Sequence, residues 1–123
     1  LDLWRSSGDR AFFDLGVLPS DIARQLGGKT QTVHLSQPTY LKISVDHPEI
    51  TLADFDTVAR WGAHIYFLDE RGVQPNIVGF ARSVGLVKFA IKRTINEELL
   101  LTTLHRSRCN QLASFEKRFR MLG

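Results

Sequence analysis

The chain has 123 residues, enough for one domain with its own hydrophobic core, and we expect residues 1–123 to form a single domain. Its one cysteine excludes an internal disulfide, and no apolar run approaches the roughly 18 to 20 residues that a membrane-spanning helix needs. The net charge of +3 is unevenly spread, because residues 82–123 carry nine basic and three acidic side chains. A basic half of this kind is typical of a protein that binds a phosphate-bearing partner such as a nucleic acid.

The first part of the chain predicts two short helices. Leu1–Leu15 contains tryptophan, phenylalanine and leucine residues at a spacing that suits a short helix docked on the core. Pro19–Leu26 predicts a second helix, with Ser20 as its cap and Gly27 just past its end, where helices commonly stop. Both helices are expected to precede the sheet.

The stretch that follows predicts a strand and two more helices. Thr32–Ser36 alternates between polar and apolar residues, as a half-buried strand does. Ser36 is suited to cap a helix with proline in its first turn, and that helix ends at His47, because the residue before a proline is pushed out of the α region. Thr51–Asp54 has the form of a capping box and opens a helix over Leu52–Gly62.

From residue 64 onward the period of the apolar residues changes from helical to two, which predicts strands. The strands are joined by short connections, so an antiparallel meander is expected. An amphipathic helix over Ser107–Leu122 closes the chain. The predicted fold class is α+β, with N-terminal helices packed on a four-stranded antiparallel sheet and a C-terminal helix. The four predicted strands are His64–Asp69, Asn76–Arg82, Leu86–Arg93 and Glu98–Arg106.

The last predicted strand turns from apolar to polar along its length, so its end is expected to emerge from the core into a cleft. Strict alternation divides its side chains between the two faces of the sheet. One face would carry Leu99, Leu101, Thr103 and His105, and the other Leu100, Thr102, Leu104 and Arg106. A hydroxyl, an imidazole and a guanidinium would then reach the cleft together.

These residue types suit the cleavage of RNA without a metal. Such a reaction needs one group to take the proton of the ribose 2′-OH, another to protonate the leaving oxygen, and cations to hold the charged phosphorane. Histidine suits the proton transfers, and lysine and arginine suit the phosphorane. No metal-ligand spacing, Walker A loop or dinucleotide-binding motif is present, and no metal or cofactor is predicted. The catalytic candidates are Lys42, His47, Thr103, His105 and Arg106, and the RNA-binding candidates are Ser36, Lys88, Lys92 and Arg93.

Each of these residues also has a purely structural interpretation. His105 and Arg106 can form the solvated end of an edge strand, and His47 can satisfy helix carbonyls at a C-terminus. His34 and His64 are expected to be structural hydrogen-bonding groups rather than catalysts. The paired lysines of the third strand can simply solvate one face of the sheet.

Two segments resemble a known superfamily. The first is VHLS-x-x-TYLK-x-x-x-x-HPEIT over residues 33–51, and the second is LLLTT-x-HR over residues 99–106. Together they resemble the phage-associated nucleases of the barnase–EndoU–colicin–RelE superfamily, which are small α+β ribonuclease toxin domains of phage and polymorphic-toxin proteins. The resemblance runs from about Leu15 to Arg106, and the helix over Ser107–Leu122 falls outside it.

The resemblance implies an RNA-binding cleft on the sheet and metal-independent cleavage by attack of the 2′-OH. Lys42 and His47 match the polar positions of the helix motif, and Thr103 matches the hydroxyl position of the last strand, with His105 or Arg106 beside it. Which residue is the general base and which the acid stays open. A cognate acidic immunity protein that covers the cleft is the implied partner.

The chain begins with leucine, so we expect a toxin domain excised from a longer, secreted or delivered protein that acts in the cytoplasm of a target cell. The alternative, from a different functional class, is a non-catalytic basic α+β module that binds nucleic acid or protein. One test separates the toxin from the binding module: substitution of His47 or His105 abolishes RNA cleavage by the toxin, whereas it leaves binding by the module nearly intact.

Overall fold

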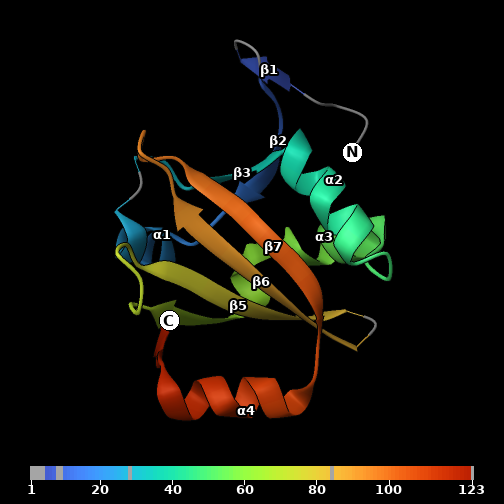
Figure 1. The fold of residues 1–123 in the computed structure, drawn as a ribbon. Coiled ribbons are helices and arrows are strands. Elements are labelled where there is room, and N and C mark those ends of the chain that lie inside the picture. The colour runs from blue at the N-terminus through green and yellow to red at the C-terminus, as the bar shows by residue number, and fades with distance from the viewer. Residues whose placement is uncertain (1–4, 8–9, 28, 84, 123) are drawn as a thin grey trace.

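A computed structural model of the chain describes residues 5–7, 10–27, 29–83 and 85–122 (Figure 1). Its α-helices are α1 (Ser20–Leu26), α2 (Gln37–Asp46), α3 (Leu52–Val58) and α4 (Cys109–Arg118), and a short 3-10 helix, η1, spans Trp61–Ala63. Its strands are β1 (Arg5–Ser7), β2 (Arg10–Val17), β3 (Thr32–Ser36), β4 (Ile65–Asp69), β5 (Asn76–Ser83), β6 (Gly85–Arg93), β7 (Leu99–Ser107) and β8 (Arg120–Leu122).

All of these strands belong to one mixed sheet in the order β1-β2-β3-β7-β6-β5-β4-β8. Neighbouring strands are antiparallel except β3 and β7, which run parallel. The predicted four-stranded antiparallel sheet is therefore wrong, although its four strands form a contiguous part, β4 to β7, of the larger sheet. The α+β class itself is compatible with the structure.

The N-terminal helix predicted over Leu1–Leu15 is also wrong where the structure describes that segment. Residues 5–7 and 10–17 are strands, and residues 1–4, 8 and 9 lie outside the described residues. The reason is the position of β3, whose Val33 and Leu35 are fully buried. A strand inside a sheet needs hydrogen-bonding partners on both sides, and β2 supplies the second one, with Phe13 opposite Leu35.

The helix boundaries around the motif of residues 33–51 are confirmed. The hydroxyl of Ser36 accepts a hydrogen bond from the backbone N–H of Thr39 (3.3 Å), and α2 ends with His47 as its C-cap. Thr51 and Asp54 form the predicted capping box at the start of α3. These contacts join residues three apart, so local sequence is sufficient to specify them.

Two other predicted helices are shorter than expected. Helix α3 stops at Val58, and the segment that was expected to continue it to Gly62 forms η1 instead. Helix α4 stops at Arg118, after which residues 120–122 pair with β4 and form the edge strand β8. Among the described residues, no helix is long and apolar enough to cross a membrane.

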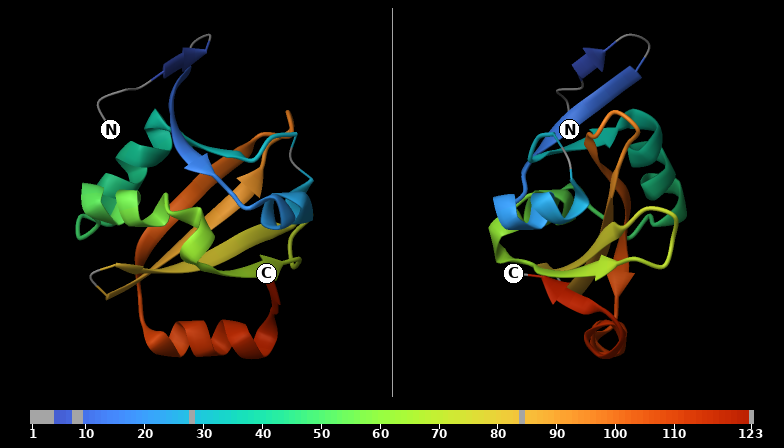
Figure 2. Two further views of the ribbon diagram at one scale, coloured as in Figure 1. Left: turned by 180° about the vertical axis from the view of Figure 1, so that it is seen from behind. Right: turned by 90° about the vertical axis from the view of Figure 1, so that its left-hand side faces the viewer.

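The sheet has a hydrophobic core on each face, with α1 and α3 over one face and α4 at one end of the other (Figure 2). The larger core lies under α1 and α3, where Ile22, Phe55 and Val58 pack on the sheet. The smaller core lies under α4, whose Leu112 packs with Phe67, Phe80 and their neighbours. Because α4 covers one end only, part of β6 and β7 stays open on this second face, which we call the open face.

Candidate active site

A β-bulge in β7 decides which side chains reach the open face. Ala90 and Ile91 are adjacent on β6, but they lie opposite Thr103 and Leu101, so Thr102 is an extra residue in β7. A bulge of this kind reverses the alternation of the side chains beyond it. The face assignment that strict alternation predicts for β7 is therefore wrong beyond Leu101. Leu99, Leu101, Leu104 and Arg106 point to the covered face, and Leu100, Thr103 and His105 to the open face.

The open face brings two predicted histidines together. His47, at the C-terminal cap of α2, and His105, on β7, have ring centroids 5.2 Å apart with 30° between their planes. The Nδ1 atom of His105 lies 2.9 Å from the backbone carbonyl oxygen of Arg106. A carbonyl oxygen can only accept, so Nδ1 carries the hydrogen and the neutral ring keeps a lone pair on Nε2.

The second histidine of the pair has an acidic neighbour. The Nδ1 atom of His47 lies 3.6 Å from Oε1 of Glu49, and the His47 side chain is 34% exposed. Both rings are only partly buried, so a substrate can reach them from the open face. The pair therefore offers two proton-transfer groups side by side.

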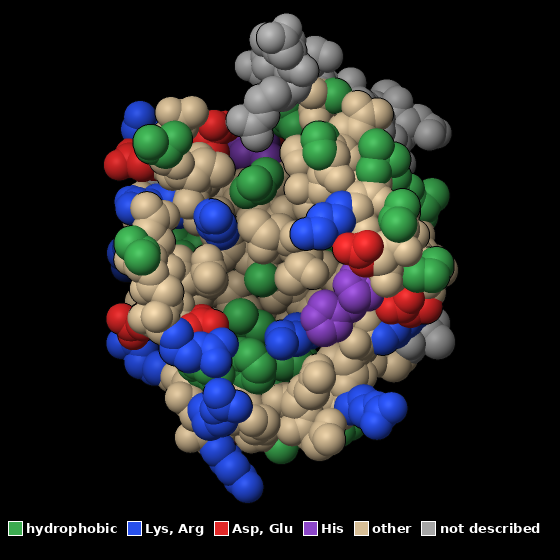
Figure 3. Space-filling view, in the orientation of Figure 1, with side chains coloured by type: hydrophobic (Ala, Val, Ile, Leu, Met, Phe, Trp, Pro, Cys, Tyr) green, Lys and Arg blue, Asp and Glu red, His purple; other side chains and the backbone are tan. Residues whose placement is uncertain are grey.

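Two lysines and a threonine lie on the same face. Lys88 is the cross-strand neighbour of His105, Thr103 lies opposite Ala90, and Lys92 lies opposite Leu100. Figure 3 shows this face with a shallow hollow over β6 and β7, basic side chains around it and two histidines in contact on its right-hand side. Lys42 is exposed on α2, the helix that borders the face.

Helix α4 positions one of these cations. The Nζ atom of Lys88 lies 4.7 Å from the centre of the Phe115 ring, which is a cation–π contact. Burial lowers the pKa of Lys88, the nearby charge of Arg71 lowers it further, and Asp69 partly opposes them. The sequence predicted only an amphipathic helix here, because the contact of Phe115 with a lysine of β6 arises from the docking of α4.

Three of the predicted site residues are used elsewhere. Arg106 points to the covered face, and its Nη2 donates to Oδ2 of Asp54 (3.0 Å). Arg93 lies on the covered face too, and its Nη1 is 3.4 Å from the position that a Cβ on Gly27 would occupy. The buried Ser36 is committed to the cap of α2. The structure therefore does not bring these three to the histidine pair.

The other two histidines have different surroundings. Nε2 of His64 donates to the backbone oxygen of Val58 (2.8 Å), and burial lowers the pKa of His64, although backbone hydrogen bonds oppose that shift. His34 lies on the open face of β3, where its Nδ1 donates to Oδ1 of Asp14 (3.0 Å) and its Nε2 lies 3.8 Å from Oε2 of Glu98.

Sequence reasoning missed the acidic partners of His34. Asp14 was assigned to a helix, and Glu98 was treated only as the start of a strand. Their approach to His34 depends on β3 lying between β2 and β7, an order that no local pattern indicates. Across the described ranges, no three histidine, cysteine or acidic side chains are placed to hold a metal ion together.

Comparisons with protein-family models, curated proteins and solved structures found no match for this chain.

Proposed function

We propose that the protein is a metal-independent endoribonuclease that cleaves RNA through attack of a ribose 2′-OH. The observation that carries this proposal is the contact between His47 and His105, with ring centroids 5.2 Å apart on an open, basic face of the sheet. Two imidazoles side by side can serve as base and acid in one reaction, because histidine exchanges protons near neutral pH.

The hydrogen bond at Nδ1 of His105 supports its role as the general base. Its Nε2 would accept the proton of the 2′-OH, and the 2′ oxygen would attack the adjacent phosphorus. His47, protonated and beside Glu49, would donate a proton to the departing 5′ oxygen as the bond from phosphorus to that oxygen breaks. The products would be a 2′,3′-cyclic phosphate and a 5′-hydroxyl end, with no net change in protons.

The cations of the open face would hold the charged phosphorane. Lys88 is the cross-strand neighbour of His105, so we assign Lys88 the stabilisation of the phosphorane, a role for which Arg106 was a candidate. Thr103 lies on the same face one pair further along and would orient a phosphate oxygen through its hydroxyl. Lys92 and Lys42 would contact the RNA backbone on either side.

The test is incubation of the purified protein with RNA in excess EDTA, beside His47→Ala and His105→Ala copies. We expect cleavage by the wild type that survives the chelator, ends in a cyclic phosphate, and is lost in both variants. DNA of the same sequence is the matched control, because it lacks the 2′-OH and should stay intact.

The rival function is a non-catalytic binding module, which the basic open face would also suit. Under that reading RNA stays intact with all three proteins, and Lys88→Ala and Lys92→Ala weaken binding while the histidine variants do not. Cleavage that survives in His47→Ala or His105→Ala at the wild-type rate would also refute the proposed mechanism.

A domain with this activity would be toxic to the cell in which it acts. We therefore propose that an acidic immunity protein covers the open face, since Lys88 and Lys92 lie on that face and charge complementarity favours such a partner. A toxin of this kind would act in the cytoplasm of a target cell, where RNA is available.

A further inference from the structure

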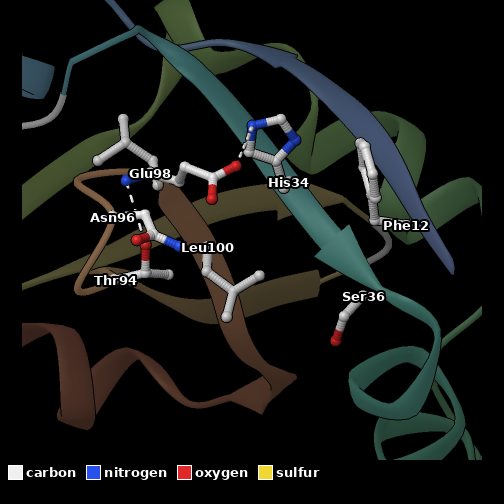
Figure 4. Close-up of a pocket in the computed structure, with 8 residues that line it drawn as sticks. Phe12, His34, Ser36, Thr94, Asn96, Glu98 and Leu100 are labelled. Carbon is white, nitrogen blue, oxygen red and sulfur yellow. Dashed lines mark hydrogen bonds and ion pairs between the residues drawn. The ribbon is translucent and has the colours of Figure 1, made fainter. Parts of the chain in front are cut away.

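A small pocket lies on the open face at the opposite end of β7 from His105 (Figure 4). It has a volume of about 220 Å³ and is formed where β2, β3, β7 and the turn between β6 and β7 meet. Its lining includes Phe12, His34, Thr94, Asn96, Glu98 and Leu100. The volume is below the ~300–1,000 Å³ of pockets for drug-sized ligands, so the pocket suits a group the size of one ring system.

The polar side of the pocket is held in place by hydrogen bonds. Thr94 and Glu98 are tied together in the turn, since Glu98 N–H donates to Thr94 Oγ1 (3.1 Å) and Thr94 N–H donates to Glu98 O (2.8 Å). His34, anchored on Asp14, lies between the two carboxylates with Nε2 3.8 Å from Oε2 of Glu98. These hydrogen bonds order the backbone of the turn at Glu98, and the half-exposed Glu98 carboxylate lies beside His34.

The chemistry of the lining differs from that of the histidine pair. Among the described residues, no lysine or arginine lines the pocket, so it does not suit a phosphate. It combines the aromatic ring of Phe12 and the side chain of Leu100 with oxygens of Glu98, Asn96 and Thr94 that can accept hydrogen bonds. A flat heterocycle with N–H donors on its edge fits this combination, and single-stranded bases are recognised in this way by proteins.

We propose that this pocket binds an unpaired RNA base that carries an exocyclic amino group, with Glu98 accepting from that group. The inference rests on the proposed ribonuclease function, because the pocket and the histidine pair share one face. Leu100 and His105 are separated along β7 by roughly 13 to 17 Å, at about 3.3 Å per residue with allowance for the bulge. The bound base would therefore belong to a neighbouring nucleotide rather than to the scissile one.

Cytosine and uracil provide a matched pair of probes. They have the same ring size, but cytosine carries a donor amino group where uracil carries an acceptor oxygen. We would measure the affinities of oligo(rC) and oligo(rU) of equal length by fluorescence anisotropy, in a His105→Ala background that prevents turnover. We expect oligo(rC) to bind on the order of tenfold more tightly, and Glu98→Gln to abolish that preference.

Glu97→Gln is the control, because it removes one negative charge at the next residue, which does not line the pocket. It should leave the preference for oligo(rC) unchanged. Equal affinities of the wild-type pocket for the two probes would overturn the pocket proposal. The proposal would also fail if Glu98→Gln and Glu97→Gln raised the affinity for both probes by the same factor, because charge repulsion alone would explain that result.

The outcomes also separate this proposal from the ribonuclease function. If the wild type cleaves RNA and binds both probes equally, the pocket proposal alone fails. If neither probe binds and RNA stays intact, both fail. A third outcome is that the protein binds an arginine-rich peptide selectively and that Glu98→Gln abolishes this binding while the affinity for RNA is unchanged. The pocket would then bind a basic side chain of a protein partner, and the proposal that it binds a nucleobase would be overturned.

Discussion

Arg106 joins the last long strand to helix α3, and its replacement is expected to reduce stability rather than catalysis. Its guanidinium donates to Asp54 (3.0 Å), and Asp54 is 1% exposed whereas Arg106 keeps 30% of its side chain exposed. Removal of one partner of a buried ion pair costs about 3 to 5 kcal/mol, and water access to the guanidinium favours the lower end. We expect Arg106→Met to lower the free energy of unfolding by about 3 kcal/mol.

Urea denaturation followed by tryptophan fluorescence would measure this loss, because Trp61 is buried. With an m-value of about 1.5 kcal/mol/M, the midpoint should fall by about 2 M. Arg108→Met is the matched control: Arg108 is exposed two residues further on, and its replacement should change the free energy of unfolding by no more than about 0.5 kcal/mol.

The loss should depend on pH in a defined direction. Burial by itself would raise the pKa of Asp54, but hydrogen bonds from Thr51 and Ser83 and the charge of Arg106 hold it below its ordinary value of 3.8. Because the pKa is lower in the folded state, the stabilisation is present above that ordinary value and is lost as pH falls through the folded pKa. The difference between wild type and Arg106→Met should be full near neutral pH and shrink below about pH 3.8.

The reasoning would be refuted by the opposite pattern of effects. If Arg106→Met keeps wild-type stability but loses RNA cleavage by a hundredfold or more at a temperature where it is folded, Arg106 contacts the substrate. If cleavage stays within about twofold of wild type under those conditions, its role is structural, as its position on the covered face predicts.

Two further predictions concern the sheet. Deletion of Thr102 removes the extra residue of the bulge and turns His105 toward the core, so we expect RNA cleavage to be lost and the free energy of unfolding to fall by at least about 3 kcal/mol. Thr102→Ala keeps the bulge and should lower the free energy of unfolding by about 1 kcal/mol or less. Cleavage that survives the deletion would contradict this role of the bulge. A methyl group on Gly79 would overlap the ring of Phe89, so Gly79→Ala should lower the free energy of unfolding by about 1 to 3 kcal/mol and lower the melting temperature with it. The control is Gly62→Ala, whose added methyl group would meet no described atom within 4 Å and should leave stability nearly unchanged. Equal effects of the two substitutions would show that the Phe89 ring simply moves aside.

The candidate site shows how far the sequence could be taken. His47 and His105 were identified as a possible acid–base pair from their residue type and from their places at a helix end and a strand end, and the fold brings them together. The side chains that share a face of the sheet with His105 could not be identified in the same way. Strict alternation would put His105 on the face of Leu101 and Arg106 on the face of Leu100. The extra residue Thr102 exchanges the two faces beyond Leu101, so His105 lies on the open face and Arg106 on the covered face.

The sequence by itself determined the features that depend on neighbours in the chain. The cap of α2 at Ser36, its end at His47 and the capping box of Thr51 and Asp54 are set by hydrogen bonds over three or four residues. Only the tertiary structure decided that β2 and β3 complete the sheet, where the bulge lies, and that a pocket forms around His34. Those features depend on backbone hydrogen bonds between strands far apart in the chain. The local pattern of a segment such as residues 10–17 is compatible with a helix and with a strand, so only the neighbouring strand β3 decides between them.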